Sequence, residues 1–305
     1  MPSQRQESSP KIISWVDWTC EVVLWVKDGN IAEQAEVILR EVMADVEQAA
    51  SRFKPDSEIL TLRDGEQAVV SPTLLDIARC ALQAAEATDG LFDPTIGQVL
   101  IDWGYRDRVP EVEVSAPSLT LSSRATYRDV KLDVDRSTMQ LPAGVVFDLG
   151  ATAKAWAADE AARRIWERFD VAVVVGIGGD LAVFCHDGDG ETVPVGISEG
   201  IEPTSTHILV GTCGLATSTT SRRRWRSATT DVHHIIDPRS ASPSVGPWRT
   251  VTVMAANCVA ANHAATVSII KGDSAQRWLS ELQLPARMVS KQGDVTYVSM
   301  WPVEC

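Results

Sequence analysis

Residues Val145 to Ile165 read Val-Val-Phe-Asp-Leu-Gly-Ala-Thr-Ala-Lys-Ala-Trp-Ala-Ala-Asp-Glu-Ala-Ala-Arg-Arg-Ile. The apolar start of this stretch predicts a strand, and its alanine-rich remainder has the spacing of a helix. A helix start presents unpaired backbone N–H groups and a partial positive charge, to which Lys154 adds a full charge. The junction therefore suits a phosphate, although an ordinary strand-to-helix turn with Lys154 in solvent fits the same residues.

Composition indicates a globular protein with an acidic surface. The chain has 305 residues, of which 45% are hydrophobic, and this content is ample for a packed core. The formal net charge of -13 argues against a nucleic-acid partner and against an anionic membrane surface. An anionic ligand would therefore need a local cationic site or a metal ion.

The beginning of the chain carries no targeting pattern. Residues 1–10 are polar and are predicted to form a disordered tail, and residues 11–305 are predicted to form a single domain. The apolar run from Trp15 to Trp25 is interrupted by polar residues, so we expect neither a signal sequence nor membrane insertion. Six cysteines are scattered without C-x-x-C pairs, which favours reduced thiols and a cytoplasmic protein.

Strands and helices follow one another in an irregular order, which predicts an α+β fold. The Gly176–Asp180 segment lacks the third glycine of a dinucleotide fingerprint, so we reject a Rossmann fold. The patterns predict a strand within 11–27, a hairpin over 130–141, a surface excursion over 109–124, strands at 171–175, 181–184, 193–198, 207–210, 250–255 and 295–300, and helices at 31–50, from 72 to about 89, 261–271 and 274–282.

A second cationic segment follows a run of small polar residues. Four arginines lie between Arg222 and Arg226, inside an otherwise acidic chain. They could form a phosphate clamp or an ordinary solvated charge run, and the preceding Ala216-Thr217-Ser218 would suit a phosphate loop. His234, a few residues further on, could contact a phosphate or transfer a proton.

A third segment offers oxygen ligands. If residues 259–267 are helical, Asn262 and Thr266 lie four positions apart on one face, and both present the oxygen atoms that Mg²⁺ prefers. A transition-metal site at His263 has no partner at suitable spacing. The Asn262 and Thr266 pair alone is weak, because such spacing arises by chance.

Taken in order, these stretches resemble the ApbE family of flavin transferases from about Trp15 to Leu282. The motifs that carry the resemblance are Ser51-Arg-Phe-Lys-Pro-Asp-Ser-Glu58, Gly90-Leu-Phe-Asp-Pro-Thr-Ile-Gly97 with Trp103-Gly-Tyr105, Asp148-Leu-Gly150 through Lys154 to Asp159, Gly178-Gly-Asp180, Ala216-Thr-Ser218, His234-Ile-Ile-Asp-Pro-Arg239 and the helix around Asn262 and Thr266. A single one of these motifs would be unspecific, whereas the ordered series is specific.

The resemblance implies antiparallel sheets with packed helices, similar to a T-fold, and a ligand cleft between two halves. It implies a reaction that splits FAD at its pyrophosphate, moves FMN to a threonine of an acceptor flavoprotein and releases AMP. Mg²⁺ would be held by Asn262, Thr266 and the carbonyl of Ala153, and His234 and Asp237 would be catalytic. The residues implied in FAD binding are Trp18, Glu58, Asp93, Lys154, Asp159, Gly179, Asp180, Ser218, Thr219, Thr220, Arg223 and His234.

The chain also departs from the family pattern. Asn262 stands where the family has Asp, which removes a negative charge and predicts weaker Mg²⁺ binding. Larger residues replace glycine at Ala151, Ala155, Thr219 and Ala241, Trp18-Thr-Cys20 replaces a Met-Gly-Thr, and Thr220-Ser221 replaces a pair that often contacts the flavin. Two alternatives therefore stay open: a protein that binds FAD or another adenine dinucleotide without transfer, and a metal-dependent FAD pyrophosphatase.

Overall fold

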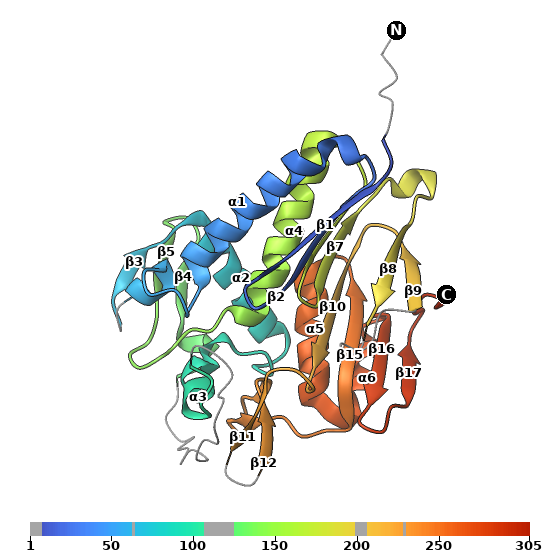
Figure 1. Ribbon diagram of the computed structural model, residues 1–305. Helices are drawn as coiled ribbons and strands as arrows, with labels where there is room; N and C mark the ends of the chain where they lie inside the picture. The colour runs from blue at the N-terminus through green and yellow to red at the C-terminus, as the bar shows by residue number, and fades with distance from the viewer. Residues whose placement is uncertain (1–7, 63–64, 107–124, 199–205, 228–229) are drawn as a thin grey trace.

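The computed structural model describes residues 8–62, 65–106, 125–198, 206–227 and 230–305. Its centre is an eight-stranded sheet in which every neighbouring pair is antiparallel (Figure 1). The strands occur in the order β1 (Lys11–Asp17), β2 (Cys20–Val26), β6 (Val173–Ile177), β7 (Asp180–Phe184), β10 (Cys213–Thr219), β15 (Trp248–Ala255), β16 (Ala286–Ser290) and β17 (Val295–Val298).

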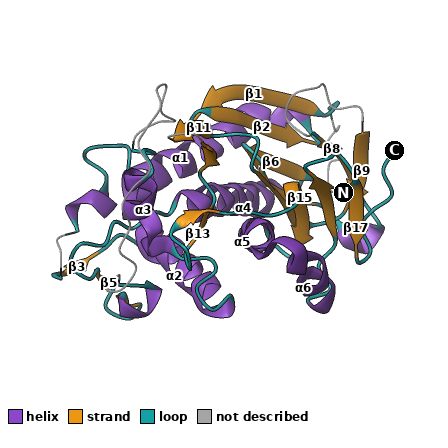
Figure 2. Cartoon of the chain, turned by 90° about the horizontal axis from the view of Figure 1, so that it is seen from below, coloured by secondary structure: helices purple, strands orange, loops and turns teal. Residues whose placement is uncertain are grey.

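Helices form a layer against one face of this sheet, as Figure 2 shows from below. They are α1 (Ala32–Ala50), α2 (Pro72–Ala87), α4 (Gly150–Phe169), α5 (Cys258–Lys271) and α6 (Ala275–Glu281), with the short α3 (Gly97–Asp102) beside them. The part of the other face formed by β6, β7 and β10 is covered by the ribbon of β8 (Val193–Ile197) and β9 (Thr206–Val210), whose apolar residues pack against Val174 and Val183. The middle strand β6 is therefore buried on both faces.

Three smaller β structures complete the described chain. A sheet in the order β3 (Gln67–Val69), β5 (Thr138–Gln140) and β4 (Lys131–Asp133) lies beyond the ends of α1 and α2 (Figure 1). The ribbons β11 (Arg224–Ser227) with β12 (Thr230–His233) and β13 (Ile236–Asp237) with β14 (Ser242–Pro243) follow β10.

The α+β prediction is confirmed, as are the predicted helices and the hairpin over 130–141. The helix α2 begins as its sequence predicts, because the Ser71 side chain accepts a hydrogen bond from the Leu74 N–H and Pro72 occupies the first turn. The predicted surface excursion over 109–124 and residues 1–7 of the predicted tail lie outside the described residues. Ser9 is described, and its carbonyl accepts a hydrogen bond from the N–H of Gly29.

The single strand expected within 11–27 is instead the hairpin of β1 and β2. Trp18 and Thr19 form its turn with φ values of 46° and 59°. Two successive left-handed residues give the turn a twist that matches the flanking strands. The apolar run conceals this turn because neither residue is glycine.

The strand expected immediately before α4 is also absent. Residues 145–149 are extended without sheet pairing, since the Val146 carbonyl accepts a hydrogen bond from Gly97 N–H and the Asp148 N–H donates to the Pro94 carbonyl. The apolar character of this run is explained by burial, because Phe147 is 3% exposed.

The phosphate loop expected at Ala216-Thr217-Ser218 is a central strand, β10. At its start, a side chain on Gly214 would lie 2.0 Å from the backbone nitrogen of Cys258. The backbone of β10 and the start of α5 are therefore in direct contact, and only glycine fits between them.

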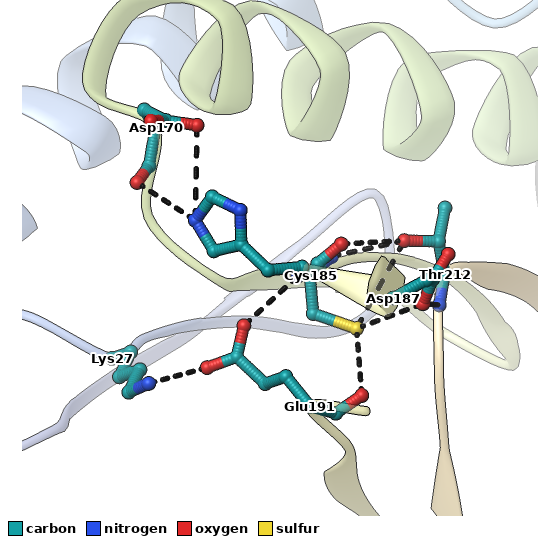
Figure 3. Close-up of polar contacts among 7 residues, drawn as sticks. Lys27, Asp170, Cys185, Asp187, Glu191 and Thr212 are labelled. Carbon is teal, nitrogen blue, oxygen red and sulfur yellow. Dashed lines mark hydrogen bonds and ion pairs between the residues drawn. The ribbon is translucent and has the colours of Figure 1, made fainter. Parts of the chain in front are cut away.

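A polar network closes the end of the sheet beside the last turn of α4 (Figure 3). The His186 N–H donates to the Glu191 carboxylate, which also binds Lys27, and the Cys185 thiol lies 3.5 Å from a carboxylate oxygen of Asp187. Burial raises the pKa of Cys185 to about 11, so this thiol is protonated and unreactive at neutral pH.

Candidate active site

The first turn of α4 is fixed by Asp148. One oxygen of this carboxylate accepts a hydrogen bond from the Gly150 N–H at 2.8 Å, and the other forms an ion pair with Arg52 at 2.5 Å. The Arg52 side chain is only 6% exposed and also donates to the carbonyls of Tyr105 and Arg106. The start of α4 is therefore held by a buried ion pair to the loop that follows α1.

Lys154 lies in the first turn of α4, and its ammonium donates to the Gly150 carbonyl at 2.8 Å. Burial and the Arg223 guanidinium lower its pKa, while the Asp180 carboxylate opposes this change. These interactions bring together three residues that are far apart in the sequence. Two cations thus lie near one carboxylate, an arrangement suited to an anion.

Asp180 is the first residue of β7 and is 3% exposed. It follows the Gly178-Gly179 turn, in which Gly178 has φ +70° and a side chain on Gly179 would lie 2.9 Å from the Thr217 carbonyl oxygen. Burial raises the pKa of the Asp180 carboxyl, and Lys154 and a hydrogen bond from Asn262 counteract this effect. The turn therefore sets a buried carboxylate against the cations.

Asn262 and Thr266 lie on α5, as the sequence predicts. The Asn262 amide donates to an Asp180 oxygen at 2.7 Å, and the Thr266 hydroxyl is 3.1 Å from the Ser218 hydroxyl of β10. The side-chain oxygen of Asn262 is buried and has no hydrogen-bond partner among the described residues. Asp180, Ser218, Asn262 and Thr266 thus form one polar cluster between the sheet and α5.

His234 lies beside the cationic part of this site. Burial, Arg223 and His233 lower its pKa well below 6.5, and its ring nitrogen Nδ1 has no hydrogen-bond partner within the described part of the chain. Its ring centroid lies 6.5 Å from that of Tyr105. The imidazole is therefore neutral at physiological pH and retains an unpaired polar atom.

The carboxylate of Asp237 binds Arg239, another residue of the same motif. Both carboxylate oxygens bind the Arg239 side chain, and one also accepts a hydrogen bond from the Arg239 N–H at 2.9 Å. The Asp-Pro-Arg sequence thus forms a closed turn that begins three residues after His234.

Several of the expected ligand residues make structural contacts. Asp159 uses both oxygens to accept hydrogen bonds from the N–H groups of Cys258 and Val259, at 2.8 and 2.9 Å. Burial raises the pKa of Asp159 to about 6. Its carboxylate therefore joins α4 to the first turn of α5.

Glu58 and Asp93 also serve local structure. Glu58 accepts hydrogen bonds from the backbone and hydroxyl of Ser71, next to the start of α2. Asp93 is 6% exposed and accepts from the N–H and hydroxyl of Thr95. Both carboxylates stabilise the segments that carry them.

The remaining expected residues lie at strand ends. Thr219 and Thr220 both bond to the Arg249 carbonyl, and the Thr219 hydroxyl is also 3.1 Å from that of Thr250. Trp18 occupies the β1–β2 turn, next to Cys20. The Cys20 sulfur would lie 3.4 Å from a side-chain carbon added to Gly178, so this turn contacts the Gly178-Gly179 turn.

An aromatic cluster at the edge of the site is not predicted by the sequence. The Tyr105 and Trp225 rings stack with centroids 5.8 Å apart, and Arg52 lies 5.1 Å from the centre of the Tyr105 ring. The Trp225 indole donates to the Trp103 carbonyl at 2.8 Å. The Arg-Phe motif, the Trp-Gly-Tyr motif and the arginine-rich segment that contains Trp225 contribute these residues, but nothing in their spacing indicates that they meet.

The fold and the polar cluster around Asp180 define the class of protein. It is an antiparallel α+β protein with a polar, cationic site between its central sheet and the helices α4 and α5. A model of the ApbE family matches residues 16–288. The chain belongs to the ApbE family.

Individual relatives agree with this assignment. The chain is 25% identical to a FAD:protein FMN transferase of Escherichia coli (strain K12) over 276 residues, which are 86% of this chain and 78% of that protein. It is 24% identical to a FAD:protein FMN transferase of Vibrio cholerae serotype O1 over 283 residues, 89% of this chain and 84% of that protein.

Solved structures share the fold. The ApbE protein of Thermotoga maritima superposes with a TM-score of 0.84 at 21% identity, covering 95% of this chain and 97% of that one. The flavin transferase ApbE of Vibrio cholerae gives a TM-score of 0.76 at 19% identity, with coverage of 95% and 97%.

Proposed function

We propose that this protein is an Mg²⁺-dependent FAD:protein FMN transferase, which moves FMN from FAD to a threonine of an acceptor flavoprotein and releases AMP. The observation that carries the proposal is the convergence of Lys154 and Arg223 on the buried Asp180 and Asn262 pair, in a chain of net charge -13. The names of the family relatives support the same activity.

The reaction is a phosphoryl-group substitution. The acceptor hydroxyl oxygen bonds to the phosphorus on the FMN side, the bond from that phosphorus to the bridging oxygen breaks, and AMP leaves with the bonding electrons. Lys154 and Arg223 would stabilise the negative charge on the phosphate oxygens. Neutral His234 is in the form that can accept the proton of the hydroxyl, and Asp237 would hold the turn that follows it.

The residues present fit a hard cation. The unpaired, buried oxygen of Asn262 is an available ligand, and the Thr266 hydroxyl and the Ala153 carbonyl would complete the proposed set. No group of three or more His, Cys, Asp or Glu side chains suited to a metal occurs in the described ranges, so the proposed ligands are an amide oxygen, a hydroxyl and a backbone carbonyl. A bound Mg²⁺ would neutralise pyrophosphate charge.

The proposed setting is the cytoplasm, where FAD is available, with the acceptor protein as the second substrate. No helix within the described residues is both long and apolar enough to cross a bilayer. The remaining proposed FAD contacts are Trp18, Glu58, Asp93, Asp159, Gly179, Ser218, Thr219 and Thr220.

The decisive experiment incubates the purified protein with FAD and Mg²⁺, with and without a threonine-containing acceptor peptide. We expect AMP together with covalently bound flavin in the peptide, measured by chromatography and by flavin fluorescence after denaturing electrophoresis. AMP without labelled peptide would favour the FAD pyrophosphatase, and retained FAD without AMP would favour the non-transferring binder. No AMP and no retained FAD would refute all three activities.

A charge-removing variant tests the site itself. Lys154→Met should lower kcat/KM for FAD by about 10- to 100-fold, because it removes a cation from the phosphate oxygens. The matched control is Lys131→Met, which alters an exposed lysine on the small sheet. Equal activities of these two variants would argue against the proposed position of the pyrophosphate.

A further inference from the structure

The metal site proposed above lacks a carboxylate at its expected position, since residue 262 is an asparagine. One carboxylate oxygen of Asp180 lies 2.7 Å from the amide nitrogen of that asparagine. We infer that Asp180 supplies the negative charge of the cation site through its hydrogen bond to Asn262, and that it aims the Asn262 oxygen at the cation. This inference rests on the proposed function.

The orientation of the Asn262 amide follows from its partner. Lys154, Arg223 and the hydrogen bond from Asn262 favour the charged form of Asp180 against the effect of burial on its pKa. An ionised carboxylate only accepts hydrogen bonds, so the amide nitrogen of Asn262 faces Asp180 and the amide oxygen points away from it. That oxygen is buried without a hydrogen-bond partner in the described chain. A buried carbonyl oxygen without a partner costs free energy, and a cation would remove that cost.

The surroundings hold Asp180 in place. The Gly178-Gly179 turn fixes its backbone, and its side chain is 3% exposed. Asn262 is 7% exposed and lies on α5, four residues before Thr266. Asp180 is thus a rigid partner rather than a mobile surface acid.

A second interpretation is that Asp180 serves only as a counter-ion for Lys154 and Arg223, which both interact with it. The two interpretations differ in what an exchange of the two side chains should do. If Asp180 provides the charge of the cation site, placing Asp at 262 and Asn at 180 conserves both the charge and the hydrogen bond. If Asp180 is only a counter-ion, the exchange adds a carboxylate to a site that had none.

The experiment measures Mn²⁺ binding to the flavin-free protein by electron paramagnetic resonance of free Mn²⁺, and Mg²⁺ binding by calorimetry. Asp180→Asn keeps an acceptor oxygen for the Asn262 amide but removes the negative charge, and it should therefore weaken binding about 10- to 100-fold, as expected for a change in the outer partner of a metal ligand. The exchange variant Asp180→Asn/Asn262→Asp should bind within about 3-fold of the wild-type protein, because the pair keeps its charge and its hydrogen bond. Asp135→Asn, which changes an exposed hairpin acid, is the control for loss of one negative charge and should have no effect.

Thermal unfolding without metal shows which variants fold. If Asp180→Asn is unfolded, the Mn²⁺ affinity of the exchange variant still distinguishes the two interpretations, because this variant contains the same two side chains as the wild-type pair. Binding by Asp180→Asn equal to wild type, or binding by the exchange variant more than about 10-fold tighter than wild type, would overturn the inference. Absence of Mn²⁺ binding in the wild-type protein would overturn it too, whereas absence of AMP with intact Mn²⁺ binding would refute only the proposed transfer reaction.

Discussion

His263 illustrates how the environment of one residue decides its chemistry. The side chain is 8% exposed, its ring nitrogen lies 3.1 Å from the Thr152 hydroxyl, and its ring packs on Phe92 with centroids 4.4 Å apart. Burial lowers its pKa to about 4. It is therefore a neutral core histidine.

Acidification should destabilise the fold through this residue. The unfolded chain binds a proton at His263 near pH 6.5 and the folded chain only near pH 4, so protons favour unfolding between these values. Between pH 7.5 and pH 5 the free energy of unfolding should fall by about 2 kcal/mol from His263 alone. Urea unfolding with a chelator present, compared with His263→Gln, measures this contribution.

The conservative glutamine can still bond to Thr152, so its curve should be flatter over this pH range. Parallel curves for the two proteins would show that His263 does not titrate as its burial implies. The other titrating groups, Asp159 and His233 among them, are common to both proteins and cancel in the comparison.

Residue identities in the site could be predicted from the sequence, but their contacts could not. Lys154, Asp180, Ser218, Asn262 and Thr266 were each indicated by a motif, and the structure brings them together. The hydrogen bond between Asp180 and Asn262 joins positions 82 residues apart, and no local pattern reports such a distance.

At the scale of elements, the site depends on how α4 and α5 are joined. Asp159 on α4 accepts hydrogen bonds from the first turn of α5, so the helix that carries Ala153 and Lys154 is fixed to the helix that carries Asn262 and Thr266. The carboxylate also suits the positive end of the α5 dipole.

Removing this link should lower stability. Asp159→Ala leaves two backbone N–H groups without their acceptor, and we expect the free energy of unfolding to fall by about 2 kcal/mol. Asp159→Asn keeps one acceptor oxygen and should lose less. Denaturant unfolding and FAD kinetics of both variants separate the possible roles: unchanged stability with a raised KM for FAD would instead support direct cofactor binding by Asp159.

Strand predictions succeeded where apolar periodicity dominates and failed where turns or polar strands interrupt it. The left-handed turn at Trp18 and Thr19 carries no glycine, so the β1–β2 hairpin resembles one strand. The sequence of β10 is small and polar, yet its Leu215 and Ala216 are buried between neighbouring strands. Such burial is created by tertiary pairing and is not visible in the segment itself.

At the scale of the whole molecule, residues 304 and 305 connect two separate β structures. Cys305 exchanges backbone hydrogen bonds with His207 of β9. Glu304 forms an ion pair with Arg287 at 2.9 Å, where the two side chains are 18% and 11% exposed. Residues 304 and 305 thus connect the β8–β9 ribbon to the main sheet.

Truncation tests the prediction that residues 11–305 form a single domain. Deletion of residues 301–305 should lower the melting temperature by several degrees, because it removes the Glu304 ion pair of a largely buried arginine at a cost of about 1–3 kcal/mol. Deletion of residues 1–7, the matched control, should leave the melting temperature unchanged. Calorimetry should show one transition for each protein, and two separate transitions would contradict the single-domain prediction.

The order of strands in the main sheet also has a consequence for synthesis of the protein. Val22 of β2 pairs with Ile177 of β6, so more than half of the 305 residues must leave the ribosome before β2 meets its second neighbour. Until then the edge of β2 that pairs with β6 lacks its partner strand, and the α4 residues that share the core with Val22, Leu24 and Val26 are also still missing or only just made. The nascent chain is therefore expected to depend on chaperones during this interval, and slow translation should prolong that dependence.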